Sequence, residues 1–302
     1  MILVCGDSIL DEIREYRSDK ISAEAPIPVL IPKNKFFFLG GAANVANNIK
    51  KLSGQVFFLS LIGKDKEGLE IKRLLKHNKI NHKLLEDKYY KTSHKKRGHL
   101  DKKLIFRVDK EEPKKIKFLH KKLILKFIKK NVKNFSSIII SDYNKGFFDK
   151  DLIKKISLIF KNENKLVLTN PKNKNILYYN YSNIIVPNEK EFNNFFTKKM
   201  SLKKKIDIFF KKIIGLKHLI ITRGYKSVLI ASFKKKIEIK YLKVDRVRSI
   251  DVTGASDTFL ATLSVYLAKK INILQSSRKA IKASKKVVTK KYTSFVKRHE
   301  IE

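Results

Sequence analysis

The sequence has few of the residues that cross-link or anchor a chain. Its 302 residues include one cysteine, Cys5, and no tryptophan. A single cysteine excludes a disulfide framework and a cysteine-based zinc site, as is typical of a reducing compartment. The first residues, MILVCGD, lack the basic stretch of a signal peptide, and no apolar run approaches the roughly 20 residues that span a bilayer. We therefore expect a soluble, cytoplasmic protein that has no membrane partner.

Acidic residues are scarce relative to basic ones. The chain has 69 Lys and Arg against 28 Asp and Glu, a formal net charge of +41. Such an excess attracts polyanions, so a nucleic-acid-binding protein is one class to consider. The lysines, however, recur on the polar faces of amphipathic stretches such as SLKKKIDIFFKKIIG (201–215). This distribution indicates a chain-wide bias in residue choice, without a specific nucleic-acid partner.

Strand-like apolar runs alternate with amphipathic segments of helix length. ILVCGD (2–7) and QVFFLSLIG (55–63) are typical of buried strands, and GGAANVANNIKKL (40–52) is typical of a helix entered through two glycines. The alternation continues as far as KSVLIASF (226–233). Because strands that alternate with helices form parallel sheets, we expect an α/β fold with a doubly wound, mostly parallel sheet and helices on both faces.

Two segments interrupt this alternation. Residues 27–38 and 89–109 carry short strand-like runs with turn residues, and the second predicts a hairpin that turns at Gly98. The prolines of APIPVLIP (25–32) suit an edge strand. A small β flap beside the main sheet accounts for both segments, with lid segments near 12–38 and 85–110.

Polar motifs follow the predicted strands at their carboxyl ends, where doubly wound sheets bind ligands. These motifs are GD with the nearby Asp11, SDYNKG (141–146), VPNEKE (186–191), TRG (222–224) and DVTGASDTF (251–259). The last precedes an apolar helix, so its free N–H groups can hold an anion and Gly254 lets the main chain come close. Asp257 in the first helical turn can take a proton from a hydroxyl, or can simply offset the helix dipole.

Two stretches of the chain, DVTGASDTF and the glycine-rich GGAANVA, resemble the signatures of one enzyme family. DVTGASDTF is similar to the D-[TV]-T-G-A-G-D-x-F signature of the PfkB/ribokinase carbohydrate kinases, and GGAANVA (40–46) resembles their glycine-rich sugar-binding signature. ISAEAPIPV (21–29), SDYNKG and VPNEKEF further resemble the heptose 7-phosphate kinase domains of the bifunctional heptose kinase/adenylyltransferases of lipopolysaccharide-core synthesis. The resemblance covers nearly the whole chain and implies a ribokinase-like fold.

The resemblance implies an ATP-dependent kinase that uses Mg²⁺. Its substrate would be D-glycero-β-D-manno-heptose 7-phosphate, phosphorylated on the anomeric hydroxyl to the 1,7-bisphosphate. We expect one kinase domain over residues 1–302 and, since no H-x-G-H motif occurs, a separate adenylyltransferase as pathway partner. Related kinases also imply a homodimer through the β flap. Another PfkB-type sugar kinase remains the alternative.

The same resemblance assigns the site residues. Asp257 is implied as the general base, and Gly254, Ala255 and Ser256 as the anion hole. Substrate binding is implied for Asp11, Gly40, Gly41, Asn44, Asp142 and Lys145, and Lys95, Arg97 and Arg107 are expected either to meet a substrate phosphate or to be solvated. Nucleotide binding is implied for Asn188, Glu191, Thr222, Arg223, Gly224 and Thr253, with Asn188 and Glu191 also organising Mg²⁺, in part through water.

Several positions depart from the family pattern. Ser256 stands at the second glycine of G-A-G-D, Asn170 at an aspartate of the heptose kinases, and Ser227 at a glycine of the nucleotide turn. Near the C-terminus, a segment with Tyr292 and no proline replaces the expected G-T-x-x-x-x-P. These changes leave open an active enzyme or a decaying homologue of low activity.

Overall fold

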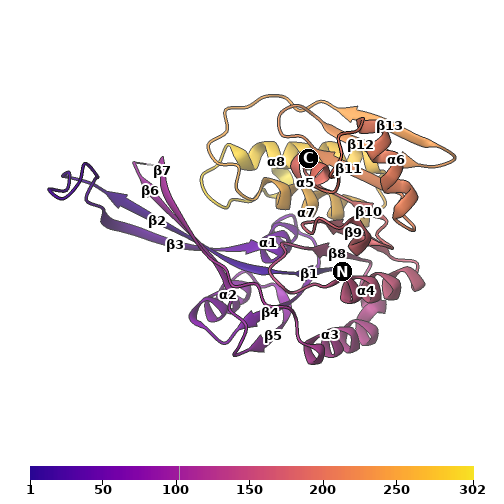
Figure 1. Ribbon diagram of the computed structural model, residues 1–302, viewed down its shortest axis with the longest axis horizontal. Helices are drawn as coiled ribbons and strands as arrows, with labels where there is room; N and C mark the ends of the chain where they lie inside the picture. The colour runs from indigo at the N-terminus through magenta and orange to yellow at the C-terminus, as the bar shows by residue number, and fades with distance from the viewer. Residues whose placement is uncertain (102) are drawn as a thin grey trace.

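The larger of two sheets forms the body of the protein. Our computed structural model describes residues 1–101 and 103–302 (Figure 1). The strands of this sheet are β1 (Ile2–Gly6), β4 (Val56–Gly63), β5 (Asn81–Asp87), β8 (Ser137–Ser141), β9 (Leu166–Asn170), β10 (Ile184–Ile185), β11 (His218–Thr222), β12 (Val228–Phe233) and β13 (Ile237–Leu242). Their order is β13-β12-β11-β10-β9-β8-β1-β4-β5. All neighbours from β5 to β11 pair in parallel, and β12 and β13 are antiparallel, which confirms the predicted mostly parallel sheet.

Helices cover both faces of this sheet. They are α1 (Ala42–Lys51), α2 (Lys66–His77), α3 (Phe118–Asn131), α4 (Lys150–Asn162), α5 (Glu189–Asn194), α6 (Leu202–Lys212), α7 (Ala255–Ala268) and α8 (Ile273–Val288). The side chains of α1, α2, α7 and α8 contribute to one core, and those of α3, α4, α5 and α6 to a second. No helix of the described residues is both long and apolar enough to cross a membrane.

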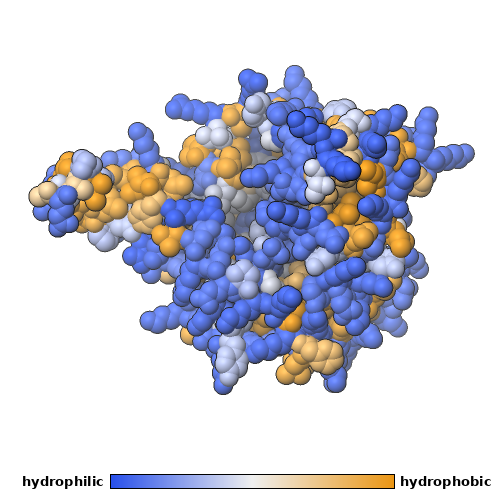
Figure 2. Space-filling model, in the orientation of Figure 1, coloured by the Kyte–Doolittle hydropathy of each residue, from blue (hydrophilic) through white to orange (hydrophobic). Residues whose placement is uncertain are grey.

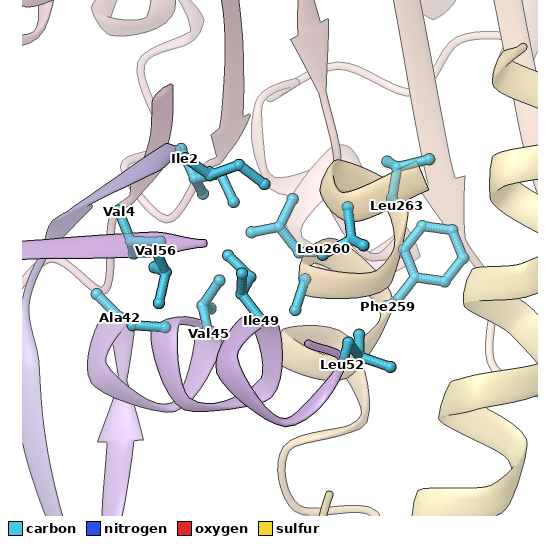
Figure 3. Close-up of a cluster of buried hydrophobic side chains, with 14 of the residues drawn as sticks. Ile2, Val4, Ala42, Val45, Ile49, Leu52, Val56, Phe259, Leu260 and Leu263 are labelled. Atoms are coloured by element: carbon cyan, nitrogen blue, oxygen red, sulfur yellow. The ribbon is translucent and has the colours of Figure 1, made fainter. Parts of the chain in front are cut away.

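The alternation of strand side chains explains the two cores. In β1, Ile2 and Val4 point into the first core, whereas Leu3 and Cys5 point into the second. Successive strand residues face opposite sides of a sheet, so a strand buried on both faces is apolar throughout. Figure 3 shows the first core, where α1 and α7 pack together beside β1. Each large side chain buried in this way contributes about 1.5–3 kcal/mol, and the contact fixes α7 against α1.

The smaller sheet is a four-stranded lid. It consists of β2 (Ser8–Arg17), β3 (Ile31–Gly41), β6 (Ser93–Leu100) and β7 (Lys103–Lys110), in the order β3-β2-β6-β7. The lid projects from the body at the left of Figure 1. Its first segment begins before residue 12 and ends after residue 38. Residues 85–87 of the second predicted region, 85–110, belong to β5 of the large sheet instead. Lys102, in that region, lies outside the described residues.

The predicted hairpin exists, but its turn is not at Gly98. Gly98 lies within β6 and pairs with Phe106, while Asp101, after the strand, has a φ of 47°. A Cβ at Gly98 would lie 2.2 Å from Cε1 of Phe106, so glycine is required there for ring packing. Glycine occurs within strands where a neighbouring group approaches the backbone closely, and it also occurs in turns. The presence of Gly98 alone therefore did not locate the turn of the hairpin.

Candidate active site

Two neighbouring cavities lie at the carboxyl ends of the parallel strands. The smaller, of about 220 Å³, is lined by residues of the lid, by residues at or just after the ends of β9, β10 and β11, and by the N-terminus of α7. The larger, of about 490 Å³, has a mainly apolar lining that includes Tyr225, Val244 and Phe259. Asn188, Thr222, Val252 and Ser256 line both cavities. Ligands bound in the two cavities would therefore lie next to each other near the start of α7.

Asp257 is held in the first turn of α7 by two hydrogen bonds. Asn44 Nδ2 donates to Asp257 Oδ2 at 2.7 Å, and the Tyr143 hydroxyl donates to Asp257 Oδ1. Asn44 comes from α1 and Tyr143 from the loop after β8, so three distant segments converge on one carboxylate. The carboxylate also lines the smaller cavity. This geometry favours the acid–base role of Asp257 over mere compensation of the helix dipole.

A second set of contacts fixes Asn44 itself. Asn48 Nδ2 donates to Asn44 Oδ1 at 3.0 Å, and Thr258 Oγ1 donates to Asn48 Oδ1 at 2.9 Å. All of these side chains are at least nine-tenths buried. The chain of bonds ties α1 to α7 and directs the Asn44 amide group at Asp257. Asn44, which we expected to bind sugar, is not in the cavity lining, and its amide group donates to the Asp257 carboxylate.

Burial makes Asp257 a stronger base than an ordinary aspartate. Loss of hydration raises the pKa of its carboxyl to about 6, because the charged form loses contact with water. Hydrogen bonds from Tyr143 and Asn44 lower that pKa, and the nearby Asp11 raises it. Burial also raises the pKa of Tyr143 well above its usual value, so its hydroxyl stays protonated and donates. A carboxylate with a pKa of about 6 is ionised at neutral pH and still accepts a proton readily.

The N-terminus of α7 offers backbone N–H groups to an anion. Gly254 precedes the helix with a φ of 79°, a conformation that favours glycine, and a Cβ there would lie 2.9 Å from Asn44 Nδ2. The N–H of Ala255 donates to Val252 O at 3.3 Å, whereas those of Ser256 and Asp257 have no backbone acceptor in residues 1–101 and 103–302. Among the described residues, the N–H of Gly254 has no backbone acceptor either, so the N–H groups of Gly254, Ser256 and Asp257 are available to an anion at this helix end.

Asp11 and Gly41 form one corner of the smaller cavity, and Gly40 lies beside Asp11. Arg97 Nη1 donates to Asp11 Oδ1 at 2.7 Å, and both side chains line the cavity. Gly40 lies against Asp11, where a Cβ would be 2.6 Å from Asp11 Oδ2. Gly41, with a φ of 59°, carries the chain from β3 into α1 and lines the cavity. Asp11 lies inside β2, a strand that the sequence analysis did not identify.

The lid cations differ in position. Lys95 lines the cavity, and its Nζ donates to Asp109 Oδ2 at 2.9 Å and to Glu111. Arg107 is outside the lining and makes two bonds to Asp109, at 2.7 and 2.6 Å. These bonds, led by that of Arg107, hold the pKa of the Asp109 carboxyl well below its usual range. Of the three expected phosphate contacts, Lys95 and Arg97 reach the cavity and Arg107 does not.

The SDYNKG loop contributes a residue that the sequence analysis did not assign. Asp142 is buried outside the cavity lining and accepts from the hydroxyl of Tyr179 at 2.7 Å, and Lys145 pairs with Glu111 outside the lining. Asp142 and Lys145, which we expected to bind the sugar, therefore do not line this cavity. Tyr143, between them, reaches Asp257 instead. Tyr143 is part of the SDYNKG motif, but the sequence alone does not show that its hydroxyl bonds to Asp257, which lies 114 positions away.

Asp7 holds the SDYNKG loop in place through hydrogen bonds to its backbone. Its carboxylate accepts from the N–H of Tyr143 at 2.8 Å and from the N–H of Phe147 at 3.0 Å. Burial, together with the nearby Asp142, raises the pKa of the Asp7 carboxyl to about 7. The loop is thus held by buried carboxylates at the end of β1 and β8, which positions Tyr143.

The expected nucleotide residues surround the junction of the cavities. Asn188 caps α5: its Oδ1 accepts from the N–H of Glu191 at 2.8 Å, and Glu191 Oε2 accepts from the N–H of Asn188 at 2.9 Å. Thr222 and Thr253 line the smaller cavity, and Gly224, with a φ of 60°, lines the larger. Arg223 is in neither lining, and its Nε donates to Glu189 Oε1 at 2.8 Å.

Mg²⁺ fits this site only as a partner of bound phosphate. No group of three or more His, Cys, Asp or Glu side chains that could hold a metal occurs in the part of the chain described. Glu191 lines the cavity, but its oxygens accept from Asn188 and from Lys172 Nζ, the latter at 2.7 Å. Because Mg²⁺ keeps several waters, Glu191 and Asn188 fit a water-mediated contact to nucleotide-bound metal.

Of the four departures from the family pattern, Ser256 and Asn170 line a cavity and Ser227 and Tyr292 do not. Ser256 is exposed at the junction of the two cavities, and Asn170 lines the smaller one. Ser227 is buried, and its main-chain carbonyl accepts from the N–H of Arg223 at 3.0 Å. Tyr292 stacks on Phe36 and donates its hydroxyl to Glu15, so it joins the C-terminal segment to the lid.

Comparison with known proteins defines the class to which this arrangement belongs. A model described as pfkB family carbohydrate kinase matches residues 1–299, and the chain belongs to that family. It is therefore an ATP-dependent sugar kinase.

Individual relatives within this family are similar to the chain over nearly its whole length. The chain is 32% identical to Bifunctional protein HldE of Helicobacter pylori (strain HPAG1) over 99% of its own length and 65% of that protein. It is 34% identical to Bifunctional protein HldE of Campylobacter curvus (strain 525.92) over 96% of its length and 61% of the relative. The chain thus spans less than two thirds of these relatives.

Solved structures share the fold. Phosphofructokinase-2 from Escherichia coli, in complex with substrates and products, aligns with a TM-score of 0.76 at 16% identity, over 99% of this chain and 96% of that one. Ribokinase from Thermotoga maritima aligns with a TM-score of 0.75 at 20% identity, over 99% of this chain and 97% of that one. These similarities confirm the predicted ribokinase-like fold.

Proposed function

We propose that this kinase phosphorylates the anomeric hydroxyl of D-glycero-β-D-manno-heptose 7-phosphate with ATP, giving the 1,7-bisphosphate of ADP-heptose and lipopolysaccharide-core synthesis. The observation that carries the proposal is the position of Asp257. Its buried carboxylate lies at the N-terminus of α7 and lines a cavity whose lid side carries Lys95 and Arg97. Similarity to the HldE proteins over nearly the whole chain supports the heptose substrate.

In this proposal Asp257 acts as the general base. Its carboxylate accepts the proton of the acceptor hydroxyl while that oxygen forms a bond to the γ-phosphorus of ATP. The bond between the γ-phosphorus and the bridging oxygen breaks, and its electron pair leaves with ADP. The N–H groups of Ser256 and Asp257 stabilise the charge on the transferring phosphoryl oxygens. Mg²⁺ supplies further neutralisation of phosphate charge when it is bound with the nucleotide.

The lid side is the proposed sugar site. Asp11, Gly40 and Gly41 border the position of the sugar hydroxyls, and Arg97 holds the Asp11 carboxylate in place. Lys95 and Arg97 supply positive charge for a substrate phosphate, which favours a phosphorylated sugar over a neutral one. Closure of the lid over this site would exclude water from the reacting phosphoryl group.

The larger cavity is the proposed adenosine site. Its apolar lining suits a purine ring, and it opens toward Asn188, Thr222 and Gly224 at the junction. Thr253 lines the smaller cavity just before α7 begins, and we place it beside the phosphates of the bound nucleotide. ATP placed in this way directs its γ-phosphoryl group at the N-terminus of α7.

Partners complete the proposal. The lid exposes Phe36, Leu104, Ile105 and Val108, and Figure 2 shows apolar residues gathered on this projection, which supports a homodimer through the lid. The 1,7-bisphosphate product implies a later adenylyltransferase, which we propose is a separate enzyme in the cytoplasm. Neither a specific nucleic acid nor a membrane enters the proposed reaction.

The test is a substrate panel. Purified protein with ATP and Mg²⁺ is assayed by ADP release against the heptose 7-phosphate, the unphosphorylated heptose, ribose and fructose 6-phosphate. We expect the highest kcat/KM for the heptose 7-phosphate. A higher value for another sugar would assign a different acceptor within the family, and no turnover of any sugar by the folded protein would indicate a decayed enzyme.

A further inference from the structure

Lys172 is a basic residue of the smaller cavity that lies outside the lid. It follows β9 and Pro171, and its side chain lines the cavity together with Ser256 and Asp257. The other basic residues of that lining, Lys95 and Arg97, belong to lid strand β6. Lys172 is therefore a basic side chain on the part of the cavity wall formed by the end of β9 and the start of α7 rather than by the lid residues.

The main chain at Lys172 is anchored on a buried tyrosine. The Tyr179 hydroxyl accepts from the N–H of Lys172 at 2.9 Å and from the N–H of Asn173 at 2.7 Å. Tyr179 is fully buried and donates to Asp142 at 2.7 Å. The backbone of this turn is thus fixed, whereas the Lys172 side chain is 46% exposed and can move.

The ion pair of Lys172 is one that a nucleotide can replace. Lys172 Nζ lies 2.7 Å from Glu191 Oε1, at the junction where Asn188 borders both cavities. A solvent-accessible pair of this kind contributes about 0–1 kcal/mol, so exchanging its partner costs little. A polyphosphate carries more charge than one carboxylate and competes well for the ammonium group.

We propose that Lys172 contacts the γ-phosphoryl group of the nucleotide, and that its ion pair with Glu191 is exchanged for this contact when the nucleotide binds. The proposal rests on the kinase function above. The side-chain nitrogen of Lys172 donates to the phosphoryl oxygens, while the N–H groups of Ser256 and Asp257 contact the same group from α7. Before nucleotide binds, Glu191 holds the ammonium group at the junction.

The test compares Lys172→Met with Lys174→Met, an exposed lysine two residues further along the same turn. Binding of the ATP analogue AMP-PNP and of AMP is measured by calorimetry in EDTA, so neither catalysis nor metal is needed. We expect Lys172→Met to weaken AMP-PNP binding about tenfold and to leave AMP binding unchanged. Lys174→Met should leave both affinities unchanged.

Glu191→Gln provides a second, opposite test. Glutamine keeps the capping bonds of α5 but releases Lys172, so AMP-PNP should bind a few-fold more tightly, by about the strength of one surface ion pair. The double variant with Lys172→Met should lose this gain. In the assay with a sugar acceptor, Lys172→Met should lower kcat about 10- to 100-fold with little change in the KM of the sugar.

Two results would overturn the proposal. One is AMP-PNP binding by Lys172→Met that equals the parent. The other is an equal loss of AMP and AMP-PNP binding, which would assign Lys172 a structural role in the turn. If Lys172→Met unfolds at a lower temperature than the parent, Lys172→Gln in the same binding assay decides. Absence of sugar turnover by the parent would refute the kinase proposal alone, because the binding result is independent of it.

Discussion

Tyr143→Phe should shift the pH dependence of the reaction rather than abolish activity. The Tyr143 hydroxyl donates to the Asp257 carboxylate and lowers the pKa of that group, which burial raises to about 6. A hydrogen bond to a charged group contributes about 1.5–3 kcal/mol. At 1.36 kcal/mol per pKa unit, its loss should raise the pKa of Asp257 by about 1–2 units.

The assay is kcat/KM for the sugar between pH 5 and pH 9. The base is active when ionised, so the rate of the parent should fall as the pH drops through about 6. In Tyr143→Phe the same fall should occur at about pH 7–8, and the two enzymes should converge above it. Tyr266→Phe is the matched control, because the Tyr266 hydroxyl is buried without a partner in the described part of the chain. An equal loss of rate at every pH, with no shift of the acid limb, would refute the reasoning.

Further predictions concern the base, the lid and the start of α7. Asp257→Asn should lower turnover by about two orders of magnitude or more while AMP-PNP still binds, as calorimetry can show, because only the proton acceptor is lost. Arg97→Gln should raise the KM of a sugar phosphate at least about tenfold, and Arg107→Gln should change it less than about twofold, since Arg97 alone of the pair lines the cavity. Gly254→Ala should lower the free energy of unfolding by about 1–2 kcal/mol in urea titration and also lower kcat, because φ is 79° and the added Cβ would crowd Asn44. An unchanged stability of Gly254→Ala, or equal effects at Arg97 and Arg107, would contradict the geometry.

Much of the fold follows from local sequence patterns. β1 is apolar on both faces and so reads as a buried parallel strand, and the sheet and its covering helices were predicted from that alternation. The DVTGASDTF turn was also predicted correctly as a helix N-terminus, because glycine, a first-turn carboxylate and the apolar spacing of α7 agree. These features depend on contacts close in sequence.

The parts that sequence could not predict depend on long-range contacts. Asp11 lies in a strand whose charged and apolar residues give no clear alternation, so β2 was missed. Asn44 and Asp257 are 213 positions apart, and their hydrogen bond exists only because apolar residues pack α1 against α7. Lys172 reads as one lysine among 69 Lys and Arg, and only the cavity and the anchoring Tyr179 distinguish it.

The central claim is that Asp257 deprotonates a sugar hydroxyl that ATP then phosphorylates. The most direct measurement is ³¹P NMR of the heptose 7-phosphate incubated with ATP and Mg²⁺, with the parent protein and with Asp257→Asn. We expect the parent to produce a second, anomeric phosphate signal on the heptose, and Asp257→Asn to produce none in the same time. Equal production of that signal by both proteins would contradict the role of Asp257, and a new phosphate signal at another position of the sugar would contradict the proposed reaction.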